Sequence, residues 1–137
     1  SAESRQFIAD KFNRIPERTD ILVSHLPPAL VMDVAYCPKR LEGYQCTLCG
    51  EFHRGKHWGS GDLRHRTRYL SSKHRLKLHC FGHVHEFHQV MNLDGMIYSN
   101  ASMPYRHQVP NIIDLPLSLF GSSTTDKKKD RKDCNPQ

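Results

Sequence analysis

Apolar residues near the N-terminus recur at helical spacing. Phe7, Ile8, Phe12 and Ile15 fall on one face of a helical wheel, and mostly polar side chains occupy the positions between them. The pattern predicts an amphipathic helix that ends at Pro16, because proline cannot continue the helical hydrogen bonds.

Short apolar runs further along the chain predict strands. Residues 21–23 form a run too short for a helix before two prolines, and its continuous apolar character is typical of a strand buried on both faces. Residues 76–80 alternate between apolar and polar side chains, which predicts a second strand that Gly82 ends. Two further runs flank the Asp-Gly dipeptide at 94–95, which favours a type I′ hairpin turn. Residues 111–117 predict a last strand.

The segment between the first two strands has a different character. Residues 29–61 are rich in glycine, cysteine, histidine and charge and lack a clear period, so they predict a long loop or insert. Residues 61–75 then predict a helix with Asp62 as its N-cap and Leu63 and Leu70 at helical offsets. A helix, a strand, an insert, a helix and several strands, without an internal repeat, form an α/β pattern.

Length and composition set bounds on this pattern. A chain of 137 residues with 37% hydrophobic content can bury one modest core, so we expect one domain. No apolar run approaches the roughly 18 residues that span a bilayer, and no signal-peptide pattern opens the sequence. We therefore expect a cytoplasmic protein without a membrane segment.

The chain carries a formal charge of +6, which favours anionic partners such as phosphates, nucleic acid or acidic surfaces. Part of this excess lies in residues 121–137, which lack apolar periodicity and predict a disordered basic tail. The five cysteines, in a chain without a secretory signal, favour thiols or metal ligands over disulfides.

Histidines follow two of the predicted strands. His25 comes just after residues 21–23, and His83 and His85 follow the strand that Gly82 ends. Ligands bind outside the carboxyl ends of strands in α/β sheets, and glycine permits a close approach of the chain to an ion. A single histidine of this kind is more often structural, but three at matching strand ends predict a shared metal site.

Four motifs follow one another with specific spacing: TDILVSHLPP (19–28), KLHCFGHVHE (77–86), YSNAS (98–102) and NIIDLPL (111–117). Together they resemble the C-terminal half of the calcineurin-like metallophosphoesterases, and in particular the small phosphodiesterases that carry a metallophosphoesterase domain. The resemblance implies an α/β fold that is the C-terminal half of an αββα sandwich. Residues 1–120 would form a partial phosphoesterase domain with an insert at about 30–58, and the basic tail would follow it.

The resemblance also implies a chemistry. In that family two divalent metals, commonly manganese, iron or zinc, clamp a phosphate ester and supply the hydroxide that attacks it. By motif, His25 and His83 would bind one metal, His85 would bind the other, and Asn100 would support them. The expected function is metal-dependent hydrolysis of a phosphodiester or phosphomonoester.

The sequence also departs from that family. The family's first half supplies an Asp-x-His, a Gly-Asp-x-x-Asp with a metal-bridging aspartate and a Gly-Asn-His segment, and none of these occurs in the chain. The nearest string, at residues 61–65, follows the insert and cannot replace the bridging aspartate. We therefore expect the chain alone to be inactive and, given its serine start, to be a fragment, a truncated gene product or a degenerate relative. A complementing N-terminal half or a homo-oligomer would then complete the site and cover exposed strand edges.

The insert carries a second set of candidate metal ligands. The spacing Cys46-x-x-Cys49 brings two thiolates to one tetrahedral ion, and His53-x-x-x-His57 would place two imidazoles on one helical face. These four residues predict a structural zinc, with free cysteines in a loop as the alternative. A non-catalytic, zinc-containing binding module for protein or, less favoured, nucleic acid is the second functional hypothesis.

Overall fold

The computed structural model describes residues 2–36, 42–103 and 109–120. At its centre is a four-stranded sheet in the order β1 (Ile21–Val23), β6 (Leu78–Phe81), β8 (Met96–Asn100) and β7 (Val90–Leu93). The first three strands are parallel, and β7 pairs antiparallel with β8. The expected α/β class is confirmed. Within the described ranges, no helix combines the length and apolarity that crossing a bilayer requires.

The hairpin between β7 and β8 turns at the predicted dipeptide. Asp94 and Gly95 have φ of 53° and 76°, so two successive residues adopt positive φ, as a type I′ turn requires. The register pairs Leu93 with Met96 directly across this turn. The predicted hairpin turn is therefore confirmed. Its geometry depends only on these two neighbouring residues, which the sequence shows directly.

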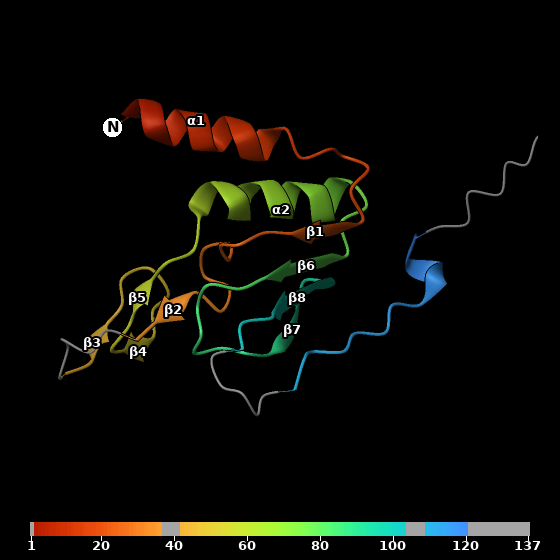
Figure 1. Cartoon of the computed structure of the whole chain (residues 1–137). Helices are drawn as coiled ribbons and strands as arrows, with labels where there is room; N and C mark the ends of the chain where they lie inside the picture. The colour runs from red at the N-terminus through yellow and green to blue at the C-terminus, as the bar shows by residue number, and fades with distance from the viewer. Residues whose placement is uncertain (1, 37–41, 104–108, 121–137) are drawn as a thin grey trace, which may run out of the picture.

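Helix α2 (Gly61–Lys73) covers one face of the sheet, and α1 (Ala2–Asn13) lies on the far side of α2 (Figure 1). The core between α2 and the sheet is a cluster of buried apolar side chains: Val31, Met32, Leu70, Leu76, Phe81, Met96 and Tyr98. The first helix packs less closely, since Phe7 and Ile8 on its predicted apolar face are 60% and 47% exposed. Both predicted helices are present, and α2 buries one row of side chains, Leu63, Thr67 and Leu70.

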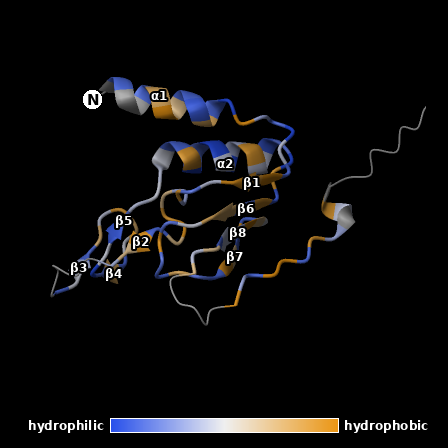
Figure 2. Ribbon diagram, in the orientation of Figure 1, coloured by the Kyte–Doolittle hydropathy of each residue, from blue (hydrophilic) through white to orange (hydrophobic). Residues whose placement is uncertain are grey.

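The second face of the sheet is open at its edge. Strand β1 is one of the two edge strands, and Val23 is 75% exposed (Figure 2 shows the apolar character of β1). The prediction that residues 21–23 are buried on both faces is therefore wrong. The apolar run correctly indicated a strand, but burial depends on what covers the strand, and α2 covers one side.

The insert contains short strands rather than a continuous loop. Strand β2 (Val34–Ala35) pairs antiparallel with β5 (Lys56–His57), and β3 (Tyr44–Gln45) pairs antiparallel with β4 (Phe52–His53). Figure 1 shows these strands grouped beyond the carboxyl ends of β1 and β6. His53 and His57 therefore lie on two strands, and the prediction that they share a helical face is wrong.

Two boundaries differ from the prediction. The N-cap of α2 is Ser60, whose Oγ accepts a hydrogen bond from Leu63 N at 3.2 Å, and Asp62 lies in the first turn instead. Residues 111–116 form no strand, and a 3₁₀ helix, η1 (Leu117–Phe120), follows them. Asn111 contacts β8 through its side chain, which donates to Asn100 O at 2.9 Å. The predicted basic tail, residues 121–137, lies outside the described residues.

The burial of Leu70 in the core predicts how shortening its side chain changes the stability of the fold. Leu70 is fully buried, so Leu70→Ala is expected to lower the free energy of unfolding by about 2–5 kcal/mol through lost burial and the cavity that remains. Leu48→Ala, at a side chain 68% exposed, should change it by less than about 0.5 kcal/mol. Urea denaturation followed by circular dichroism measures both. Equal effects would contradict the packing of α2 on the sheet.

Candidate functional site

The first candidate site forms where β1 and β6 end. The two strands are parallel neighbours, so the loops that follow them leave the same edge of the sheet, and Gly82 N donates to His25 O at 3.2 Å. His83 Nδ1 lies 3.1 Å from His25 Nε2, and the ring centroids are 4.9 Å apart. The structure thus brings together two of the three histidines that the sequence singled out.

The backbone at His83 is in an unusual conformation. Its φ is 69°, in the left-handed region that non-glycine residues seldom occupy, at a cost of roughly 1 kcal/mol. The fully buried Asn100 donates from Nδ2 to Val84 O at 2.7 Å, and its Oδ1 accepts from Ser102 N at 3.0 Å. Asn100 therefore fixes the chain immediately after His83.

His85 is exposed and stands apart from the pair. Across the described part of the chain, no hydrogen bond or ring contact joins His85 to His25 or His83. Its assignment as a ligand, like that of the other two histidines, remains a prediction.

A partly buried polar pair that no local sequence pattern predicts joins the residue after β1 to β6. His79 is fully buried on β6, and its Nε2 lies 2.8 Å from Ser24 Oγ, which itself donates to Leu26 O at 2.7 Å. Burial lowers the pKa of His79 to about 4, so the ring is neutral at pH 7. The only sequence signal for His79 is its position in the alternating strand, where its side chain points to the opposite face of the sheet from Leu78 and Cys80.

The second candidate site is the cysteine and histidine cluster of the insert. One ligand atom each from Cys46, Cys49, His53 and His57 lie within 4.8 Å of one another. Cys49 Sγ is 3.4 Å from His53 Nε2, and the rings of His53 and His57 meet edge to face at 5.2 Å. All four residues that the sequence predicted therefore come together, and the cluster fits a metal site.

The two cysteines sit in a tight turn closed by the backbone. Cys46 N donates to Glu51 O at 2.9 Å, Gly50 N donates to Cys46 O at 3.0 Å, and Gly50 has a φ of 78° that glycine adopts readily. Backbone N–H groups also approach each sulfur, from Leu48 to Cys46 at 3.4 Å and from Glu51 to Cys49 at 3.5 Å. Such donors, first that of Cys49 and then that of Leu48, lower the pKa of Cys46 to about 6. They favour the thiolate form that binds metals.

Asp33 connects the cluster to the rest of the fold. Its buried carboxylate accepts hydrogen bonds from His57 Nδ1 at 2.8 Å and from Gly59 N at 3.2 Å. Burial alone would lower the pKa of His57, but the hydrogen bond and charge of Asp33 raise it overall. The sequence gives no local signal for Asp33, because its partner lies 24 positions away.

Trp58 links the two candidate sites. It follows His57, donates from its backbone N to Asp33 O at 2.8 Å and places its ring 5.5 Å from the ring of His83. The insert therefore contributes one wall beside the histidine pair.

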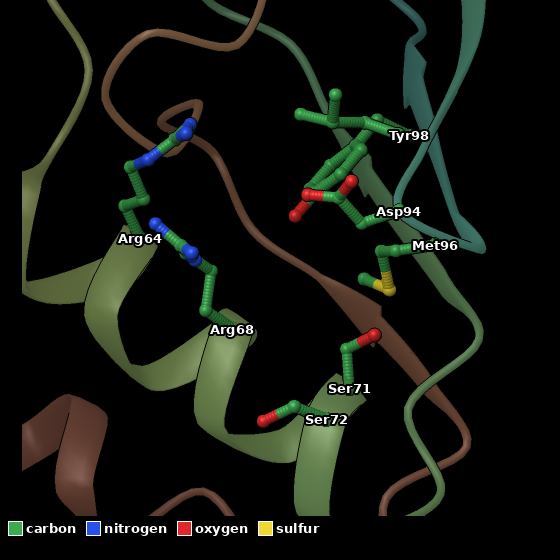
Figure 3. Close-up of a pocket in the computed structure, with 8 residues that line it drawn as sticks. Arg64, Arg68, Ser71, Ser72, Asp94, Met96 and Tyr98 are labelled. Carbon is green, nitrogen blue, oxygen red and sulfur yellow. The ribbon is translucent and has the colours of Figure 1, made fainter.

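A basic cavity lies elsewhere, between α2 and the β7–β8 hairpin (Figure 3). It has a volume of about 140 Å³, and Arg64 and Arg68 enter it from α2 opposite Asp94 and Tyr98. None of the candidate metal ligands lines it. It is separate from the two metal-ligand clusters.

Two known proteins are distantly similar to this chain. No family model matches the chain. The chain is 30% identical over 115 residues to metallophosphoesterase domain-containing protein 1 of Homo sapiens, and equally to the protein of that name from Mus musculus. The match covers 81% of this chain, but the chain spans only 29% of the length of these relatives. The similarity supports a metallophosphoesterase-like relationship.

The buried His79 predicts a pH dependence of stability. Its folded pKa of about 4 lies below its ordinary value of 6.5, so the unfolded chain takes up a proton between these values that the folded chain does not. The contribution of neutral His79 to the free energy of unfolding is fully present above pH 6.5 and is lost as the pH falls toward 4. The loss is about 3 kcal/mol, at roughly 1.4 kcal/mol per pKa unit.

Urea denaturation from pH 7.5 to 4 measures this contribution. His79→Asn should show a shallower loss than the wild type, whereas His65→Asn, at an exposed position on α2, should keep the wild-type slope. Identical slopes for the wild type and His79→Asn would contradict a neutral buried imidazole.

Proposed function

We propose that this chain supplies the C-terminal part of a metal-dependent phosphoesterase centre. His25 and His83 are the ligands, His85 is a further ligand, and the substrate is a phosphodiester or phosphomonoester. The observation that carries the proposal is the meeting of His25 Nε2 and His83 Nδ1 at 3.1 Å, at the ends of adjacent parallel strands. The distant similarity to metallophosphoesterase domain-containing protein 1 supports the same assignment.

The donor groups fit part of such a centre. Imidazole nitrogen suits manganese, iron and zinc, and the Asn100 hydrogen bond holds the loop that carries His83. Among the residues that the structure describes, however, the one group of three or more metal-ligating side chains lies in the insert, so no carboxylate completes a group with His25 and His83. Two dications surrounded by neutral donors repel each other, because nothing offsets their charge.

The missing anionic ligands would therefore come from outside this chain. The chain spans 29% of the length of its relatives, and a longer chain or a second chain has room to supply them. When bound, the metals would activate water and polarise the phosphate ester. His25 and His83 would hold the metal as ligands, and Asn100 would position the loop that carries His83. Trp58 would form a wall beside His83.

The test is hydrolysis of bis(nitrophenyl) phosphate with added manganese. We expect little turnover by the 137-residue chain and substantial turnover by a product extended upstream to include Asp-x-His and Gly-Asn-His motifs. In the extended product, His83→Ala should lower activity at least 100-fold, whereas His65→Ala, an exposed histidine on α2, should leave it unchanged. Turnover by the short chain that His83→Ala abolishes would show that the site is complete without further ligands.

Inactivity of the extended product would favour a binding module instead. The specific observation behind this alternative is the basic face of α2, where Arg64, His65, Arg68 and Lys73 line an open cavity of about 520 Å³. Such a face suits a phosphate backbone.

Fluorescence anisotropy with labelled single-stranded RNA tests the binding module. Arg68→Gln should weaken binding several-fold and reduce its salt dependence, whereas Arg18→Gln, exposed and outside α2, should have little effect. Equal effects of the two substitutions would indicate nonspecific attraction to the net charge.

A further inference from the structure

We infer that Cys46, Cys49, His53 and His57 bind one structural zinc ion, and that this ion fixes Trp58 beside His83. The inference rests on the geometry of the insert and does not depend on the proposed phosphoesterase function. The donor atoms of the four residues lie within 4.8 Å of one another, and they come from two strands, β4 and β5, and from the turn that follows β3.

The donor set matches tetrahedral zinc. Zinc–sulfur bonds of about 2.3 Å and zinc–nitrogen bonds of about 2.0 Å place neighbouring donors roughly 3.3–3.8 Å apart. Cys49 Sγ and His53 Nε2 are already 3.4 Å apart. Two thiolates and two imidazoles fill all four positions, which is typical of a structural site rather than a catalytic one.

The hydrogen bonds around the cluster point to a ligand. His57 commits Nδ1 to the buried carboxylate of Asp33, and its Nε2 is buried with no hydrogen-bond partner among the described residues. An unpartnered buried nitrogen is destabilising, and metal coordination would remove that cost. A carboxylate that orients a histidine through its second nitrogen is the usual support for a zinc-binding histidine.

The short strands of the insert also need a further interaction that joins them. In its described residues the insert has four strands of two residues each, and there the two small sheets do not pair with each other or with the main sheet. Cys46 and Cys49 follow β3, His53 lies on β4 and His57 lies on β5, so one ion would join both small sheets. Metal binding would thereby supply the folding free energy that such short strands lack.

Zinc also affects the first site, because Trp58 follows the ligand His57 directly. Its backbone N donates to Asp33 O at 2.8 Å and its ring lies 5.5 Å from His83. Loss of zinc would leave His57 and Trp58 held by Asp33 alone, so the wall that Trp58 forms would be less firmly fixed. Trp58 is the single tryptophan of the chain, so its fluorescence reports this movement.

Elemental analysis of protein purified without added metal tests the inference. We expect about one zinc per chain in the wild type and nearly none in Cys49→Ser. Cys80→Ser removes a half-buried thiol of β6 that lies outside the cluster, and it should retain the full zinc content. Zinc-free wild-type protein with an intact circular dichroism spectrum, equal zinc in the wild type and Cys49→Ser, or iron in place of zinc would overturn the inference.

Two measurements on the wild type avoid variants that fail to fold. Cobalt exchanged for zinc should give the strong visible absorption of a tetrahedral sulfur and nitrogen site, and octahedral cobalt spectra would contradict it. Chelation should shift Trp58 emission, and restored zinc should reverse the shift. An unchanged emission in zinc-depleted protein would overturn the link to Trp58. None of these readouts depends on phosphoesterase activity.

Discussion

The buried carboxylate of Asp33 is the contact on which the arrangement of the insert depends. The carboxylate accepts hydrogen bonds from His57 Nδ1 and Gly59 N, and the backbone oxygen of Asp33 accepts one from Trp58 N. Asp33 therefore holds three consecutive residues in place. Gly59 has no room for a side chain, because a Cβ there would lie 2.7 Å from Asp33 Oδ2 and 2.6 Å from Ala29 Cα. A buried charge is tolerated only when it is paired in this way. Asp33 thus decides which nitrogen of His57 faces the cysteines and where Trp58 lies.

The parallel pairing of β1 with β6 has a similar effect on the histidine pair. Parallel neighbours deliver their following loops to one edge, so His25 and His83 meet although 58 positions separate them. The left-handed backbone of His83 is then maintained by Asn100, which lies at the end of the third parallel strand. Each of the three strands contributes one residue to this edge, and each contribution follows from the register of the sheet.

The two candidate sites differ in completeness. The insert offers two thiolates and two imidazoles, which satisfy a single ion in both number and charge. The strand-end site offers a pair of imidazoles, and the described residues bring no third ligand to it. The open second face of the sheet at β1 has the same character, since Val23 is exposed where a globular core would cover it.

Local signals in the sequence were sufficient for several elements. The helices, the Asp94-Gly95 turn and the Cys46-x-x-Cys49 spacing each depend on residues a few positions apart, so the sequence alone predicted them. The candidate ligands His25 and His83 also came from the sequence, through their places after strands and through the family resemblance.

Tertiary structure decided what depends on distant partners. Asp33, Ser24 and His79 acquire their roles from hydrogen bonds across 24 to 55 positions, which no local pattern encodes. The apolar run of β1 could not reveal that Val23 stays exposed. Residues 111–117 have a strand-like sequence, but they pair with no strand among the described residues. Propensity describes what a segment can form, whereas burial and pairing depend on which other segments reach it.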